Sequence, residues 1–170
     1  MCLLAVVALD VVVAWALYHV YRPTDPGLSL LAAALRFVYA AVFAVAISEL
    51  VGAIDLLGSA EHLAVFGADQ LHAEALLRIS AFHDVWNAGL GLFGLHLLLL
   101  GHLAYRSGST PRVIGVLVAV AGLGYTVDSV AAVLTGGTAP AVAPFLFVGE
   151  VLLALWLLLR GGRRPADDAA

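Results

Sequence analysis

Five long apolar stretches constrain this chain more than any other feature of its sequence. They run over Cys2–Val20, Leu28–Ile54, Phe82–Ala104, Val113–Leu134 and Val142–Leu159. An α-helix of about 20 mostly apolar residues crosses the hydrocarbon core of a bilayer. Apolar residues make up 63% of the 170 residues and charged residues only 12%, which is too few charges to cover a soluble domain. The sequence therefore predicts an all-α, multi-pass transmembrane helical bundle of about five spans, surrounded by the lipid bilayer.

Charge and cysteine content exclude other classes of protein. The formal net charge is −4, so the chain lacks the basic surface that nucleic-acid binding needs. Cys2 is the only cysteine, which leaves no intrachain disulfide. The first apolar stretch has no positively charged start and is interrupted by Asp10, so we expect a true span rather than a signal peptide.

The polar breaks between the stretches define the domain organisation. Arg22–Gly27 contains two prolines, and Gly136–Pro140 has the composition of a short hairpin. Before the fourth stretch, Thr110 is the expected N-cap and Pro111 the expected first helical residue. We expect one transmembrane helical domain over residues 1–164 and a short polar tail over residues 165–170.

The arginines predict an orientation in the membrane. With five spans, one side carries Arg22, Arg106, Arg112, Arg160, Arg163 and Arg164. Cytoplasmic loops are enriched in Arg and Lys, so this side is expected to face the cytoplasm. The C-terminus is then cytoplasmic and the N-terminus of this chain extracytoplasmic, in the cell membrane. Since no signal precedes that outer N-terminus, we expect the chain to begin one helix late.

The outer connection, residues 55–81, carries an amphipathic pattern. Leu71, Ala75, Ile79 and Phe82 share one helical face, and Glu74 and Arg78 form an i,i+4 pair on another. We expect a short interfacial amphipathic helix that leads into the third span. The alternative is a surface for a membrane protein partner or for a second copy of the chain.

Small residues recur at helical spacing within three of the stretches. The fourth has Gly115, Ala119, Gly122, Thr126 and Ser129; the third has Asp84, Asn87, Gly91, Gly94, Leu98, Gly101 and Tyr105; the second has Arg36, Ala40, Ala44 and Ser48. Small residues let membrane helices approach closely, so these stripes predict a tight bundle. The alternative is that one stripe lines a substrate cavity.

Ionisable residues inside the apolar stretches predict a buried polar cluster. Asp10 and Arg36 lie about 15 Å and about 12 Å from the inner ends of two antiparallel spans, so we expect an ion pair. The other candidates are Glu49, Asp84, Tyr125, Asp128 and Glu150, to one of which Arg36 is an alternative partner. Carboxyl groups at depth are either hydrogen-bonded neutral acids or a site for a proton, a cation or a cationic substrate.

The run from Trp86 to Ser129 resembles a known family. It contains FGLHLLLLG, then YRSG, then PR-x-x-G, then AG-x-GY-x-x-D; LAAALRFVYA around Arg36 and the segment from Gly149 to Trp156 fit as well. The pattern is similar to that of the prokaryotic membrane proteins of domain-of-unknown-function family 4386. The resemblance covers nearly the whole chain and implies no catalytic residue, since that family has no established activity.

Three classes of function remain open. Buried acids favour small-molecule or ion-coupled transport or binding, whereas the small-residue stripes and the outer helix suffice for a structural or regulatory membrane subunit. A membrane-embedded enzyme is the weaker alternative, with Tyr125, Asp128 and His96 as its candidates. The six histidines form no H-x-x-x-H or H-E-x-x-H motif, so we predict no metal site and no cofactor.

Overall fold

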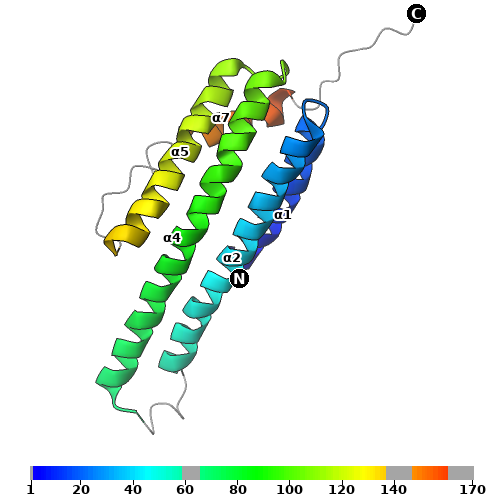
Figure 1. The fold of residues 1–170 in the computed structure, drawn as a ribbon. Coiled ribbons are helices and arrows are strands. Elements are labelled where there is room, and N and C mark those ends of the chain that lie inside the picture. Colours follow the sequence, from blue (N-terminus) through cyan, green and yellow to red (C-terminus); the bar gives the residue numbers. More distant parts are fainter. Residues whose placement is uncertain (1, 59–65, 137–146, 161–170) are drawn as a thin grey trace, which may run out of the picture.

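The protein is a bundle of α-helices (Figure 1). The structure, a computed structural model, describes residues 2–58, 66–136 and 147–160. These contain α1 (Cys2–Tyr21), α2 (Pro26–Gly58), α4 (Ala68–Arg106), α5 (Arg112–Thr135) and α7 (Val148–Arg160), and no strand. The first four helices are long and apolar enough to cross a membrane. The predicted all-α multi-helix membrane fold is therefore confirmed.

The fifth predicted span is only partly visible. Its described part, α7, has 13 residues and begins at Val148. The expected start at Val142, most of the Gly136–Pro140 hairpin and the polar tail over residues 165–170 lie outside the described residues. Gly136 itself ends α5 in the left-handed conformation, with φ of 60°, which a glycine adopts without steric cost.

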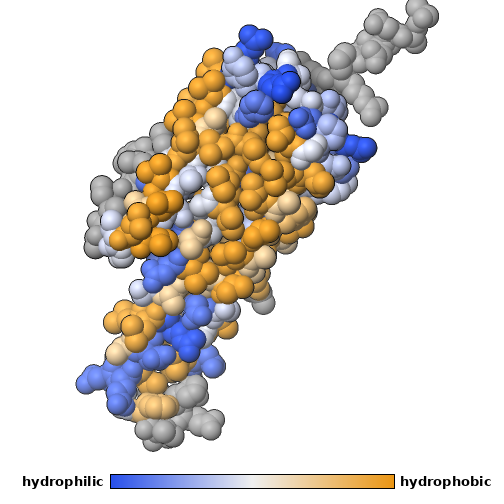
Figure 2. Space-filling view, viewed as in Figure 1, coloured by the Kyte–Doolittle hydropathy of each residue, from blue (hydrophilic) through white to orange (hydrophobic). Residues whose placement is uncertain are grey.

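Two helices are much longer than a membrane is thick. At about 1.5 Å per residue, the 33 residues of α2 extend about 50 Å and the 39 residues of α4 about 58 Å, against about 30 Å of hydrocarbon. Both run past the other helices at one end of the bundle (Figure 1). We call this projection, residues 48–58 of α2 and 68–85 of α4, the stalk. Figure 2 shows hydrophilic residues gathered on it, beyond the apolar surface of the bundle.

The stalk changes one detail of the expected fold. The predicted outer amphipathic helix is the first part of α4, without a break before the third span. It is not a separate helix, and α2 runs alongside it, with Leu56 and Leu71 lining one cavity. The expected Glu74–Arg78 pair is present, at 3.5 Å.

The strongest packing in the bundle is between α4 and α5, through their small residues. A Cβ atom on Gly101 would lie 2.6 Å from the Ala119 amide nitrogen and 2.7 Å from the Gly115 carbonyl oxygen. A Cβ on Gly91 would similarly meet the Ser129 hydroxyl. The two predicted stripes therefore face each other, and the glycines in them allow the two backbones to come into contact.

At the end opposite the stalk, hydrogen bonds connect α1 and α7 to the turn between α4 and α5. The hydroxyls of Tyr21 and Thr110 lie 3.1 Å apart, and the Trp156 indole N–H donates to the Ser109 carbonyl over 3.3 Å. The expected cap was wrong by one residue, since Pro111 is the N-cap of α5 and the helix begins at Arg112. Thr110 is instead buried against Tyr21, so its hydroxyl bonds another helix.

Candidate functional site

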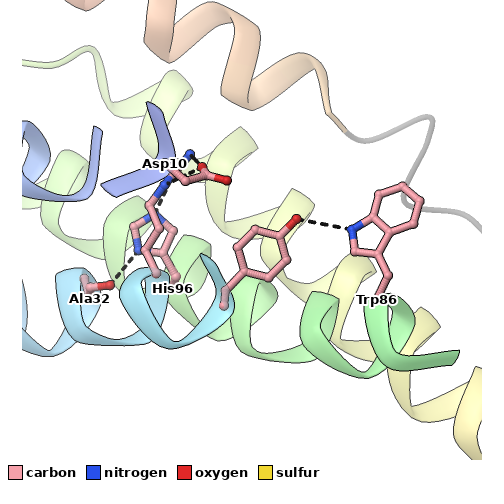
Figure 3. Close-up of polar contacts among 6 residues, drawn as sticks. Asp10, Ala32, Trp86 and His96 are labelled. Atoms are coloured by element: carbon pink, nitrogen blue, oxygen red, sulfur yellow. Dashed lines mark hydrogen bonds and ion pairs between the residues drawn. The ribbon is translucent and has the colours of Figure 1, made fainter. Parts of the chain in front are cut away.

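A guanidinium at the centre of the bundle joins three helices. Arg36 of α2 donates to Asp10 Oδ1 of α1 from Nε over 3.1 Å and from Nη2 over 2.5 Å. Its Nη1 lies 3.4 Å from Nε2 of His96 on α4. Figure 3 shows this arrangement, with Asp10 and His96 on opposite sides of the guanidinium. The ion pair predicted between Asp10 and Arg36 is thus present.

The hydrogen bonds define the tautomer of His96. Its Nδ1 lies 2.8 Å from the Ala32 carbonyl oxygen, which can only accept, so Nδ1 carries the proton. Nε2 is then the acceptor for Arg36, and the imidazole is neutral. Because His96 is only 1% exposed, these two bonds satisfy a polar side chain that water cannot reach.

Aromatic side chains extend this cluster toward the stalk. The Trp86 indole donates to the Tyr39 hydroxyl over 3.3 Å (Figure 3), and the rings of Tyr39 and Phe93 lie 4.9 Å apart. The Arg36 guanidinium carbon lies 5.2 Å from the centre of the Phe93 ring. The Arg36 guanidinium is therefore stabilised by contacts with a carboxylate, an imidazole and the face of an aromatic ring, all of which belong to the protein.

Glu150 completes the cluster from α7. This helix approaches α5 through Gly149, where a Cβ would lie 2.6 Å from the Leu117 carbonyl carbon. Tyr125 of α5 is the polar neighbour of the Glu150 carboxyl group. Oε1 of that carboxyl group is the one buried side-chain nitrogen or oxygen within residues 2–58, 66–136 and 147–160 that has no hydrogen-bond partner.

A cavity of about 350 Å³ lies between the cluster and α7. Arg36 and Glu150 are its two ionisable wall residues. The rest of the wall is apolar and comes from α1, α4 and α7: Val13, Leu17, Leu97, Leu100, Val151, Leu153, Ala154 and Leu157. The arrangement can hold a small molecule or ion with one polar end and an apolar remainder.

The structure separates the seven predicted residues into two regions. Asp10, Arg36, Tyr125 and Glu150 lie in the bundle, around the cavity or one side chain from it. Glu49 lies in the stalk and accepts from Arg78 Nη1 over 3.1 Å, so it is not a partner of Arg36. Asp84 is exposed and lines a separate cavity between the middle of α4 and the C-terminal end of α5, while Asp128 is half-buried one turn beyond Tyr125.

Two members of the cluster were not among the predicted set. His96 was considered only as one of the six histidines without a metal motif and as an enzymatic candidate, and Tyr39 was not considered. The available signal was a single histidine within a run of leucines, FGLHLLLL, because a polar group at that depth must find a partner. Among the described residues, no three His, Cys, Asp or Glu side chains are grouped as a metal site.

Comparisons with known proteins agree with the sequence resemblance. A family model described as "Domain of unknown function (DUF4386)" matches residues 1–161. A protein of Archaeoglobus fulgidus, named there as an uncharacterized protein, is 33% identical over 156 residues, which cover 92% of this chain and 79% of that protein. No solved structure matches the chain.

Proposed function

We propose, from the premise that this chain belongs to the DUF4386 family of unknown function, that it is a membrane-embedded binding protein. Its site holds one monovalent positive charge, either a proton or the cationic group of a ligand, at Glu150. Such binding is the step that ion-coupled transport through this bundle would require. The observation that carries the proposal is the buried, unpartnered Oε1 of Glu150, a residue that also belongs to the wall of the cavity.

The charge balance of the cluster supports this proposal. Asp10 and Arg36 neutralise each other, and His96 is neutral in the tautomer that its hydrogen bonds require. The neighbouring Tyr125 brings no positive charge to Glu150. An isolated ionised carboxylate in this environment would cost several kcal/mol, so Glu150 needs a proton or a cation.

Infrared spectroscopy of the protein in lipid nanodiscs tests this proposal. Without ligand, we expect a protonated-carboxyl C=O band at neutral pH that disappears in Glu150→Gln. Glu74→Gln is the matched control, because the Glu74 side chain is 48% exposed on the stalk, and it should leave the band unchanged. A spectrum without a Glu150-dependent band would show an ionised, unoccupied carboxylate and would refute the proposal.

A second candidate function, a structural or regulatory membrane subunit, is favoured by the stalk. On the stalk, Ile54 is 72%, Leu76 67% and Leu77 64% exposed. Apolar side chains exposed to water together often mark a protein interface. A partner membrane protein or a second copy of the chain would cover them.

Crosslinking in native membranes tests this second function. In a Cys2→Ala background, Ile54→Cys should form one bismaleimide-linked product of defined mass if the stalk has a partner. Asp69→Cys, also exposed on the stalk, is the control for random collision. Equal yields from both positions, or no product, would argue against a subunit role.

A further inference from the structure

We infer that the ligand of the Glu150 cavity is a membrane-dissolved amphipathic amine, which enters from the bilayer between α1 and α7. The inference rests on the proposed function and adds to it the class of ligand and its route. Three features of the cavity carry it: the composition of its wall, its position at the lipid-facing surface, and the sign of its uncompensated charge.

The wall of the cavity is suited to an apolar body with one polar end. Eight of its ten wall residues are apolar, and the two ionisable ones are Arg36 and Glu150. A volume of about 350 Å³ equals that of roughly a dozen water molecules. A hydrated inorganic cation would leave most of that apolar wall in contact with water, whereas an alkyl chain would cover it.

The cavity reaches the surface that faces lipid. Val13 of α1 and Val151 of α7 belong to its wall and are 38% and 43% exposed. In the described residues α1 packs on α2 and α7 packs on α5, with no extensive contact between α1 and α7. A molecule dissolved in the bilayer can therefore enter between these two helices without crossing the polar ends of the bundle.

The charge of the site selects an amine rather than an anion. The Arg36 guanidinium is already bonded to Asp10 through two nitrogens and to His96 through the third. Glu150 forms no ion pair among the described residues, and an ammonium group beside it at the cavity wall supplies donors together with a positive charge. Binding is then an exchange: the protonated carboxyl releases its proton to solvent, and the alkylammonium ion pairs with the carboxylate, so the net charge of the site stays constant.

The experiment uses the Glu150 carboxyl band of the protein in nanodiscs, with n-octylammonium chloride as the probe. Octylammonium should remove the band and release one proton per protein, which a pH indicator measures in weak buffer. n-Octanol, which partitions into lipid but carries no charge, should leave the band in place. Ammonium chloride, which carries the charge without the chain, should need at least tenfold higher concentration.

Variants of the cavity wall separate this inference from the proposed function. Ala154→Phe places a ring in the cavity one turn from Glu150, and Val13→Phe does so from the opposite wall. Each should keep the carboxyl band but raise the octylammonium concentration needed at least tenfold. Ala41→Phe, at an exposed position of α2 outside the wall, is the control and should respond like the wild type.

The outcomes are distinguishable. If ammonium acts as well as octylammonium, or if both wall variants respond like the wild type, the amphipathic ligand and its lateral route are refuted while proton binding at Glu150 stands. If the wild type has no Glu150-dependent band, the proposed function itself fails. A variant that does not fold loses the band before any probe is added, and the other wall variant then decides.

Discussion

At the scale of the residue, the Arg36 side chain connects three helices of the bundle. It binds Asp10 of α1 and His96 of α4 from its own position on α2. Side-chain exposure is only 14% for Arg36 and 11% for Asp10. Removing one member of such a pair leaves an uncompensated buried charge, whereas removing both removes the cost as well as the attraction.

The first prediction is a double-mutant cycle on this pair. Asp10→Leu or Arg36→Leu alone should lower the free energy of unfolding by roughly 3–5 kcal/mol. The double variant should recover most of that loss. It should remain about 1 kcal/mol below the wild type, because His96 Nε2 then lacks its donor. Thermal unfolding in detergent measures all three, and losses that simply add would show that the two residues act independently.

The second prediction concerns the hydrogen bond between Tyr21 and Thr110, whose hydroxyls are 3.1 Å apart and buried. Tyr21→Phe and Thr110→Val should each lower the free energy of unfolding by about 1 kcal/mol, because each leaves the other hydroxyl without its partner. The double variant should be no less stable than either single one. A double variant that loses the sum of both effects would indicate that the hydroxyls act elsewhere.

At the scale of the element, the contact of α4 with α5 depends on glycines, which lack a Cβ atom. The glycines at 94, 101, 115 and 122 bring backbone against backbone, and a helix of larger residues could not approach as closely. Since apolar side chains gain little by leaving lipid for another helix, this close packing is a main source of stability. The glycines of the stalk have more room: a Cβ on Gly52 would meet only the flexible side chain of Arg78, at 3.6 Å.

The third prediction compares two glycine-to-alanine changes. Gly101→Ala should destabilise the bundle by roughly 1–3 kcal/mol, because its Cβ would meet backbone atoms that cannot move aside. Gly52→Ala, also inside a helix, should be neutral or stabilise by up to about 1 kcal/mol through helix propensity. Unfolding of both variants under one condition provides the comparison. Equal effects would contradict the close approach of α4 and α5.

Elements were more predictable from the sequence than the site was. Apolar length and turn residues located α1, α2 and α5 within a few residues, and three- and four-residue spacing located the interface of α4 and α5. The separation of Glu49 from the cluster was not predictable, because its partner Arg78 is 29 residues away on a segment whose path depends on the length of α4. The role of His96 likewise depends on its lying beside Ala32 and Arg36, which is a property of the packed bundle.

At the scale of the whole molecule, the two ends differ in charge. The turn end carries Arg22, Arg106, Arg112 and Arg160, and the hydrogen bonds from Tyr21 and Trp156 to the α4–α5 turn hold these segments together. The stalk carries one arginine and five acidic residues: Glu49, Asp55, Asp69, Glu74 and Asp84. From the positive-inside rule we predict that the turn end faces the cytoplasm and that the stalk lies outside.

The last prediction tests this orientation by cysteine labelling in cells. In a Cys2→Ala background, a membrane-impermeant maleimide should label Ile54→Cys on the stalk of intact cells. Ser109→Cys, in the α4–α5 turn, should be labelled only after the cells are permeabilised. Leu95→Cys, which lies within the apolar part of α4 and is 42% exposed, should stay unlabelled in both cases because the reagent does not enter the bilayer. Labelling of Ser109→Cys in intact cells would show that the orientation is the reverse of the predicted one. The arginine-rich turns would then lie outside the cell, contrary to the positive-inside rule that other membrane proteins follow.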